Sequence, residues 1–168
     1  MGTRALIIPK DSDGKEICVI YTQYDGYPDG IMLEVARFLS TREVVNGFGL
    51  NDFYVFNGMD DLAGQLITFL KLMVYKLRRN WIEKFSKKAM EEKNAKLGFM
   101  SDFGKLITCG NIYVMPAGTR DVMEEFIYYI KPDGKGGVII EAYDVHGDSD
   151  KPIFVGTPKE YIEKFAPK

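Results

Sequence analysis

The sequence has 168 residues, enough for one domain with a sizeable hydrophobic core. Apolar residues make up 46% of it and charged residues 27%, and these values exclude an intrinsically disordered chain. The net charge of −2 excludes the strong basic field that attracts nucleic acid or anionic membranes. The charge is unevenly distributed, because residues 76–105 carry nine basic and four acidic residues, or +5, which leaves −7 for the rest.

The first predicted elements are a hairpin and a helix. Two β-branched runs, residues 4–10 and 16–24, flank the turn sequence DSDG at residues 11–14. A helix is predicted from about residue 29 to residue 39, with Asp29 available as its N-cap. Four apolar residues repeat there at helical spacing: Met32, Val35, Ala36 and Leu39.

Two longer helices are predicted in the middle of the chain. Residues 62–77 contain 11 apolar residues in 16, so this helix must be nearly surrounded by protein. Three residues can cap its start: Asn57, Asp60 and Asp61. Residues 79–97 place Trp81 and Phe85 on an apolar face and Lys and Glu on the other, which predicts a solvated amphipathic helix with core or oligomer contacts.

The C-terminal part again predicts strands. Residues 126–131 and 137–145 form a hairpin around the turn PDGKGG, and residues 110–118 and 151–156 contain shorter strands. The last helix opens with a capping box, in which Thr157 is the N-cap and Glu160 closes the box. The elements predict a single α+β domain over residues 1–168, with a mainly antiparallel sheet of five or six strands and three or four helices packed largely on one face.

Cysteine usage and hydropathy bear on the location of the protein. Cys18 and Cys109 stand in apolar segments without C-x-x-C spacing, which predicts two reduced thiols rather than a disulfide or a zinc site. No run approaches the roughly 18 apolar residues of a membrane span, and the N-terminus turns polar too soon for a signal peptide. We expect a cytoplasmic protein without a metal, a cofactor or a membrane partner.

The stretch YTQYDGYPDG, residues 21–30, is the first candidate site. A strand end followed by a helix N-terminus presents N–H groups that suit a phosphate or carboxylate. Tyrosine rings could stack on a base, whereas the alternative is that the tyrosines alternate across a strand and the glycines only turn the chain. The candidate ligand-binding residues here are Tyr21, Gln23, Tyr24, Asp25, Gly26 and Tyr27.

Two further candidates carry similar chemistry. Residues 55–61 repeat the pattern of strand, Gly turn and helix start at Asn57 and Gly58, so two helix N-termini could converge on one pocket. An Asn-Gly turn with an acidic cap explains the same residues. The tripeptide Gly-Thr-Arg occurs twice, and Arg4 and Arg120, with Thr119, could bind phosphate. Structural salt bridges are the alternative for both arginines.

No motif requires catalysis. His146 is the only histidine and lies in a polar turn, without the clustered ligands of a metal site. Serine-hydrolase and Walker motifs are absent, so we name no catalytic residue. Hydrolysis would have to rest on a carboxylate such as Asp25 or Asp29. Glu83, Glu91 and Glu92 dilute the basic segment, so we do not expect nucleic acid to bind there.

Four stretches together resemble a family of small, uncharacterised proteins common in bacteriophage genomes and their bacterial hosts. They are M-G-T-R, Y-x-Q-Y-D-G-Y-P, V-F-N-G-M and G-T-R-D, and they span most of the chain. Residues 76–105 fit the family pattern less well, which suggests an inserted basic helical segment. The resemblance implies no established reaction. It does imply a viral or mobile-element protein that acts in phage–host conflict, in the host cytoplasm.

These observations favour a binding module that sequesters a phosphorylated small molecule, such as a nucleotide signal of bacterial defence. Arg4 and Arg120 would neutralise phosphate, N–H groups near residues 26–30 and Gly58 would cradle it, and Tyr24 or Tyr27 would stack on a base. This hypothesis requires the three segments to meet in space. The alternatives are an inhibitor that binds a host protein and a carboxylate-dependent hydrolase. Homo-oligomerisation is compatible with all three.

Overall fold

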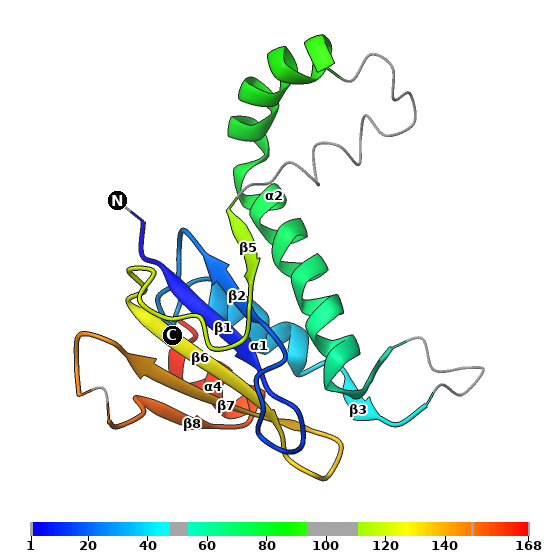
Figure 1. The fold of residues 1–168 in the computed structure, drawn as a ribbon, viewed down its shortest axis with the longest axis vertical. Coiled ribbons are helices and arrows are strands. Elements are labelled where there is room, and N and C mark those ends of the chain that lie inside the picture. Colours follow the sequence, from blue (N-terminus) through cyan, green and yellow to red (C-terminus); the bar gives the residue numbers. More distant parts are fainter. Residues whose placement is uncertain (1, 48–53, 94–110, 149, 168) are drawn as a thin grey trace.

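The computed structural model describes residues 2–47, 54–93, 111–148 and 150–167. Its elements (Figure 1) are, in chain order, β1 Ala5–Pro9, β2 Val19–Thr22, α1 Ile31–Leu39, β3 Glu43–Val45, β4 Val55–Asn57, α2 Gly58–Lys93, β5 Ile112–Met115, β6 Phe126–Pro132, β7 Val138–Asp144, β8 Phe154–Gly156 and α4 Pro158–Phe165. Both predicted hairpins, the short strands and the terminal helix are confirmed.

The six-stranded sheet is mixed but mostly antiparallel, as predicted. Its order is β5-β2-β1-β6-β7-β8, and within it only β1 and β6 run parallel, with Ala5 opposite Phe126. Strand β5 lies beside β2, and β6 lies on the far side of β1. Residues 116–125, which join β5 to β6, must therefore cross one face of the sheet over β2 and β1 (Figure 1). We call this face the crossing face.

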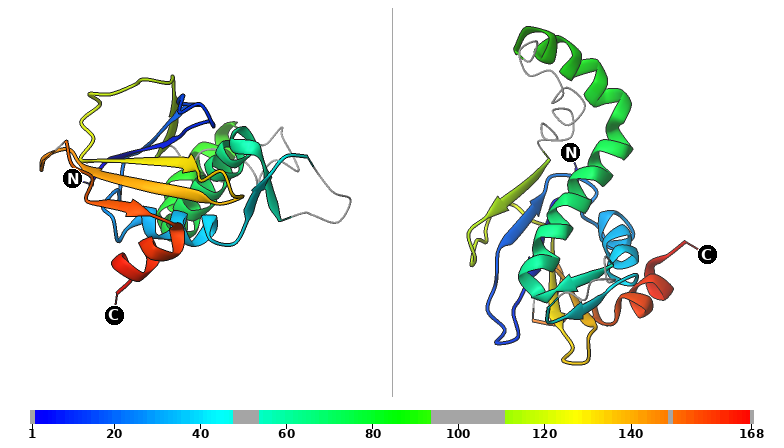
Figure 2. Two further views of the ribbon diagram at one scale, coloured as in Figure 1. Left: turned by 90° about the horizontal axis from the view of Figure 1, so that it is seen from below. Right: turned by 90° about the vertical axis from the view of Figure 1, so that its right-hand side faces the viewer.

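The helices cover the opposite face of the sheet. The left view of Figure 2 shows α1 and α4 on one side of the strands and the crossing segment on the other. Side chains alternate along each strand, so one set from every central strand meets the helices. The main core contains Ile7, Ile20, Tyr128 and Ile140 from the sheet with Val35, Leu66 and Tyr161 from the helices, all fully buried.

A smaller apolar cluster fills the crossing face. Leu6, Ile8, Val19 and Tyr21 are buried there. The residues packed against them include Met115 from β5 and Val122 from the crossing segment. The crossing segment therefore covers apolar side chains on the face of the sheet opposite the described helices α1 and α4.

The structure differs from the sequence predictions at three places. Residues 62–77 and 79–93 form one continuous helix, α2, rather than two, and residues 94–105 lie outside the described residues. Asp29 does not cap α1, because the N-cap is Gly30, which has no side-chain cap bond. The parallel pair of β3 with β4, in which Glu43 faces Val55, was not predicted, because neither three-residue strand has a periodic pattern of its own.

The helix start signal of α4 is confirmed in detail, whereas α2 begins at Gly58, four residues before the predicted range. Asp61 Oδ2 accepts a hydrogen bond from the N–H of Asn57 at 2.9 Å. Thr157 accepts from the N–H of Glu160, whose carboxylate in turn accepts from the N–H of Thr157. The two reciprocal bonds satisfy N–H groups that a helix start otherwise leaves without partners.

Replacing Thr157 with Ala should lower the free energy of unfolding by about 1 kcal/mol, because α4 then loses its N-cap. Urea unfolding followed by circular dichroism measures this. Thr68→Ala is a matched control, since Thr68 is exposed on α2 and its hydroxyl bonds only to the carbonyl of Gly64 within the helix. An equal loss in both variants would contradict the assigned role of the capping box.

Candidate functional site

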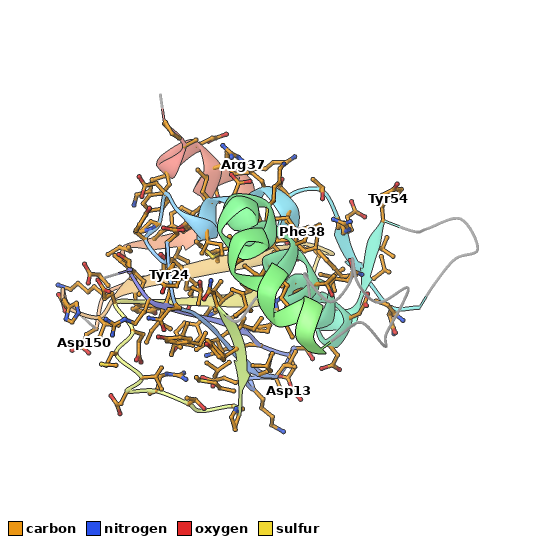
Figure 3. The ribbon with its side chains drawn as sticks, turned by 90° about the horizontal axis from the view of Figure 1, so that it is seen from above. Asp13, Tyr24, Arg37, Phe38, Tyr54 and Asp150 are labelled. Carbon is orange, nitrogen blue, oxygen red and sulfur yellow. The ribbon has the colours of Figure 1, made fainter. Side chains whose placement is uncertain are left out.

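The Tyr-rich corner at residues 21–30 packs against the start of β1. The N–H of Gly26 donates to the carbonyl of Thr3 at 2.9 Å. A Cβ placed on Gly26 would lie 2.7 Å from the Cβ of Ala5, so only glycine fits there. Tyr24 lies beside the sheet, well away from Tyr54 on the other side of α2 (Figure 3).

Five consecutive carbonyl groups of the corner accept hydrogen bonds. Two of them accept from tyrosines that reach in from distant elements: Tyr128 OH bonds to Gly26 at 2.7 Å and Tyr161 OH to Pro28 at 2.9 Å. Burial raises the pKa of both hydroxyls well above the usual range, so they remain donors. The other bonds are Thr22 Oγ1 to Tyr24 O, Ile31 N–H to Asp25 O and Gly30 N–H to Tyr27 O.

These bonds account for the unusual composition of the corner. Asp25 adopts a positive φ of 57°, and Gly26 permits the close approach of β1. The N–H groups of Gly30 and Ile31 at the start of α1 already have carbonyl partners. The corner is therefore a connection fixed to the core, which is the alternative interpretation of its tyrosines and glycines.

Arg4 and Arg120 lie on the crossing face at opposite ends of β1. Arg4 Nη1 donates to the carbonyl of Met123 at 3.3 Å, beside the start of the strand. Arg120 donates to the hydroxyl of Tyr129, which is paired with Ile8 near the end of β1. Four residues of strand span roughly 13 Å, and the two guanidinium groups have different partners, so the structure gives no shared site for them.

Arg120 takes part in a half-buried ion pair with Glu16. Burial by itself would raise the pKa of Glu16, but hydrogen bonds from Arg120 and from the N–H of Gly118 hold it below its ordinary value. Thr119 Oγ1 bonds to the carbonyl of Pro116 at 2.7 Å. The pair attaches the crossing segment to the β1–β2 turn, so Arg120 has the structural salt bridge that the sequence left as an alternative.

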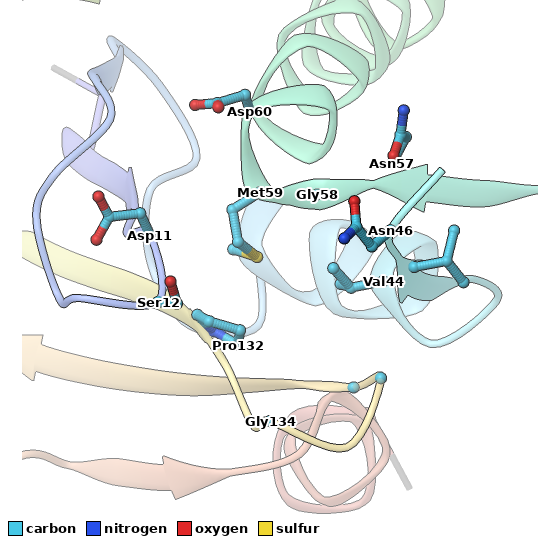
Figure 4. A pocket seen from close by; sticks show the side chains of 13 residues that line it. Asp11, Ser12, Val44, Asn46, Asn57, Gly58, Met59, Asp60, Pro132 and Gly134 are labelled. Carbon is cyan, nitrogen blue, oxygen red and sulfur yellow. The ribbon is translucent and has the colours of Figure 1, made fainter. Parts of the chain in front are cut away.

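Asn57 and Gly58 belong to a hollow of about 440 Å³ at the start of α2 (Figure 4). It lies beside the end of β1, where Asp11 and Ser12 meet the turn at residues 132–137. The corner at residues 21–30 packs on the other end of β1, so the predicted convergence of the two helix N-termini is wrong. Its described lining includes two carboxylates, Asp11 and Asp60, and no lysine or arginine, which suits an anion poorly.

A second hollow, of about 390 Å³, opens on the crossing face beside the Arg120–Glu16 pair, and we call it the crossing-face hollow. Its lining consists of Lys10, Ile127, Tyr129, Glu141, Tyr143, Asp144 and Val145. The rings of Tyr129 and Tyr143 meet nearly at right angles with centroids 5.8 Å apart. The ammonium of Lys10 lies 4.1 Å from the centre of the Tyr129 ring.

The basic side chains around this hollow differ in whether they form a salt bridge. Lys131 is paired with Glu141, and Arg120 with Glu16. Lys10 makes no salt bridge to any residue that the structure describes, and its contact is the face of Tyr129. Burial, followed by the charge of Glu141, raises the pKa of Tyr143, so its hydroxyl stays neutral. The hollow thus combines an ammonium that makes no salt bridge among the described residues, although its charge acts on nearby Glu16, with two aromatic walls and the carboxylates of Glu141 and Asp144.

Sequence reasoning missed Lys10, Tyr129 and Tyr143 as site residues. The signal was present in the second hairpin, where Tyr128 and Ile130 face the core and Tyr129 alternates with them. In the observed register of this hairpin Tyr129 lies opposite Glu141. Only the parallel pairing of β1 with β6 brings Lys10 to them.

The predicted site residues thus fall into three places: Arg4 lies near the corner of residues 21–27, Asn57 and Gly58 line the hollow at α2, and Thr119 and Arg120 lie beside the crossing-face hollow. Comparison with protein-family models gives no match for this chain, and comparisons with curated proteins and with solved structures give no significant match. Among the described residues no three His, Cys, Asp or Glu side chains gather where they could hold a metal ion. No described helix has the length and apolar character needed to span a membrane.

Tyr128→Phe should lower the free energy of unfolding by about 1–3 kcal/mol, because the buried carbonyl of Gly26 loses its donor. Urea unfolding provides the measurement. Tyr54→Phe is the control, since Tyr54 is 76% exposed and should change stability by less than about 0.5 kcal/mol. A Tyr128→Phe variant as stable as the wild type would refute the anchoring role of this hydroxyl.

The Glu16 pair should make stability depend on acidity. Because folding lowers the pKa of Glu16 below its ordinary 4.5, the stabilisation is complete above that pH and is lost as the pH falls through the lowered value. Glu16→Gln should remove a contribution on the order of 1 kcal/mol at neutral pH and flatten the decline in acid. Urea unfolding at a series of pH values tests both, and an unchanged acid slope would contradict the assignment.

Proposed function

We propose that this protein is a binding module that captures a phosphorylated small molecule with a planar ring, such as a nucleotide, in the crossing-face hollow. The observation that carries the proposal is the ammonium of Lys10, held against the ring of Tyr129 without a salt-bridge partner among the described residues. A cation held in this way keeps its charge available to an anion that enters the hollow.

The two tyrosines supply the second half of the recognition. A ring of the ligand can stack on Tyr129 or on Tyr143, whose perpendicular arrangement offers one face and one edge. The volume of about 390 Å³ lies within the range of roughly 300–1,000 Å³ that is typical of small-molecule sites. The size and lining of the hollow therefore support a small ligand rather than a polymer.

In this proposal Arg120 orients the ring of Tyr129 and does not supply the charge for the ligand. Its guanidinium bonds to the hydroxyl of Tyr129 at 3.1 Å and lies 5.7 Å from the centre of that ring. Because Glu16 neutralises it, Arg120 orients the aromatic wall, and Lys10 provides the charge for phosphate. Arg4, the Tyr-rich corner and Gly58 have no part in this site.

The resemblance to phage proteins supports a particular role for such a module. A protein that binds a nucleotide without turning it over would remove a signal used by bacterial defence, in the cytoplasm of the host. Asp25 and Asp29, the carboxylates of the hydrolase alternative, belong to the corner and not to the crossing-face hollow.

A thermal-shift screen against mono-, di- and cyclic nucleotides tests the proposal. A ligand at 100 times its dissociation constant adds about 2.7 kcal/mol to folding, which raises the melting temperature by several degrees. Ligand recovered from the denatured complex is then identified by mass spectrometry. Recovery of an intact nucleotide supports sequestration, whereas an altered nucleotide would show an enzyme and overturn it.

Lys10→Gln should weaken binding of the nucleotide found in this screen about tenfold, because the phosphate loses its cation. Lys151→Gln is the matched control, since Lys151 is exposed and pairs only with its neighbour Asp148. Isothermal titration calorimetry compares the variants. Absence of any shift across the panel, or equal affinity of Lys10→Gln and the wild type, would contradict the proposed site.

A further inference from the structure

The two edges of the six-stranded sheet are protected to different degrees. At the β8 edge, Lys164 Nζ donates to the carbonyl of Ile153 at 2.7 Å, and Pro152 and Pro158 flank the strand. Lysine and proline at an edge are known means of preventing a further strand from pairing there. The β8 edge is therefore closed to another strand.

The β5 edge, by contrast, lacks these protecting residues within the strand. Its sequence, Ile112 to Met115, contains neither a charge nor a proline. Tyr113 is 47% exposed and Val114 is 55% exposed, on opposite faces of the strand. An uncharged apolar edge of this kind is a template for pairing with another strand.

The backbone directions at β5 can be assigned. The carbonyl of Asn111 accepts from the N–H of Gln23, so the backbone groups of Asn111 and Tyr113 face β2. Because these groups alternate along a strand, those of Ile112 and Val114 point outward from the sheet. Ile112 and Val114 therefore have outward donors and acceptors with which no described strand pairs.

We propose that β5 pairs antiparallel with β5 of a second copy of this chain, which joins two six-stranded sheets edge to edge. A two-fold axis at Tyr113 places Ile112 opposite Val114 of the partner subunit and Val114 opposite Ile112 of the partner subunit. These two pairs permit about four ladder hydrogen bonds. An axis at Val114 would oppose Ile112 to a proline, Pro116, which has no N–H to donate.

The side chains fit a second copy. An uncharged strand that faces itself opposes no like charges, and the axis brings the two Tyr113 rings together on the crossing face. Further apolar surface lies nearby. The ring centroids of Tyr21 and Tyr113 are 5.8 Å apart. Arg4, whose charge acts on Tyr21, donates to the carbonyl of Met123. Met123 is 74% exposed, in a turn where the carboxylate of Glu124 accepts from the N–H groups of Asp121 and Val122.

Disulfide trapping tests the register. In a background with both native cysteines changed to Ser, Tyr113→Cys should oxidise to a covalent dimer, because directly opposed residues of a non-hydrogen-bonded pair have Cα atoms about 4.5 Å apart. Val155→Cys, at a similarly exposed position on the closed β8 edge, should form no covalent dimer. Equal cross-linking of the two variants would overturn the proposal.

Sedimentation velocity over a wide range of protein concentrations tests the association itself. The wild type should dimerise, and Val114→Lys should weaken the dimer about tenfold or more. Val155→Lys is the matched control, because Val155 is 54% exposed against 55% for Val114. A wild type that stays monomeric throughout, or a control as disruptive as Val114→Lys, would refute the proposal whether or not nucleotides bind.

Discussion

The parallel pairing of β1 with β6 is the constraint on which the rest of the structure depends. The first hairpin places β2 on one side of β1, so β6 can join β1 only on its free side. The chain must then cross from β5 over two strands, and residues 116–125 cover Leu6 and Ile8. The Arg120–Glu16 pair fixes this crossing. Where the cover ends, Tyr129 and Tyr143 line a hollow, and β5 is an edge strand to which no further described strand is paired.

Tyrosine serves two purposes in this fold, and burial separates them. Tyr128 and Tyr161 are fully buried, and their hydroxyls hold the backbone of the corner in place. Tyr129 is the next residue after Tyr128, yet it faces the other side of the sheet and stands against Lys10. The alternation of a strand thus assigns one tyrosine to stability and its neighbour to the candidate site.

The candidate site and the open edge lie on different parts of one sheet. The crossing-face hollow is built on β6 and β7, whereas β5 is separated from β6 by β2 and β1. Pairing of two copies through β5 would therefore leave both hollows open to solvent. Ligand capture and self-association are independent properties in this arrangement.

The sequence by itself determined the elements that depend on nearby residues. Asp-Gly turns between apolar runs specified both hairpins, Thr157 with Glu160 specified the start of α4, and helical spacing specified α1. Only the tertiary structure decided the parallel pairing of β1 with β6, the pair of β3 with β4, and the separation of Arg4 from Arg120. The physical reason is that turns and caps are local hydrogen-bonding preferences. Contacts between distant segments depend instead on how whole faces bury their apolar surface, which no short stretch encodes.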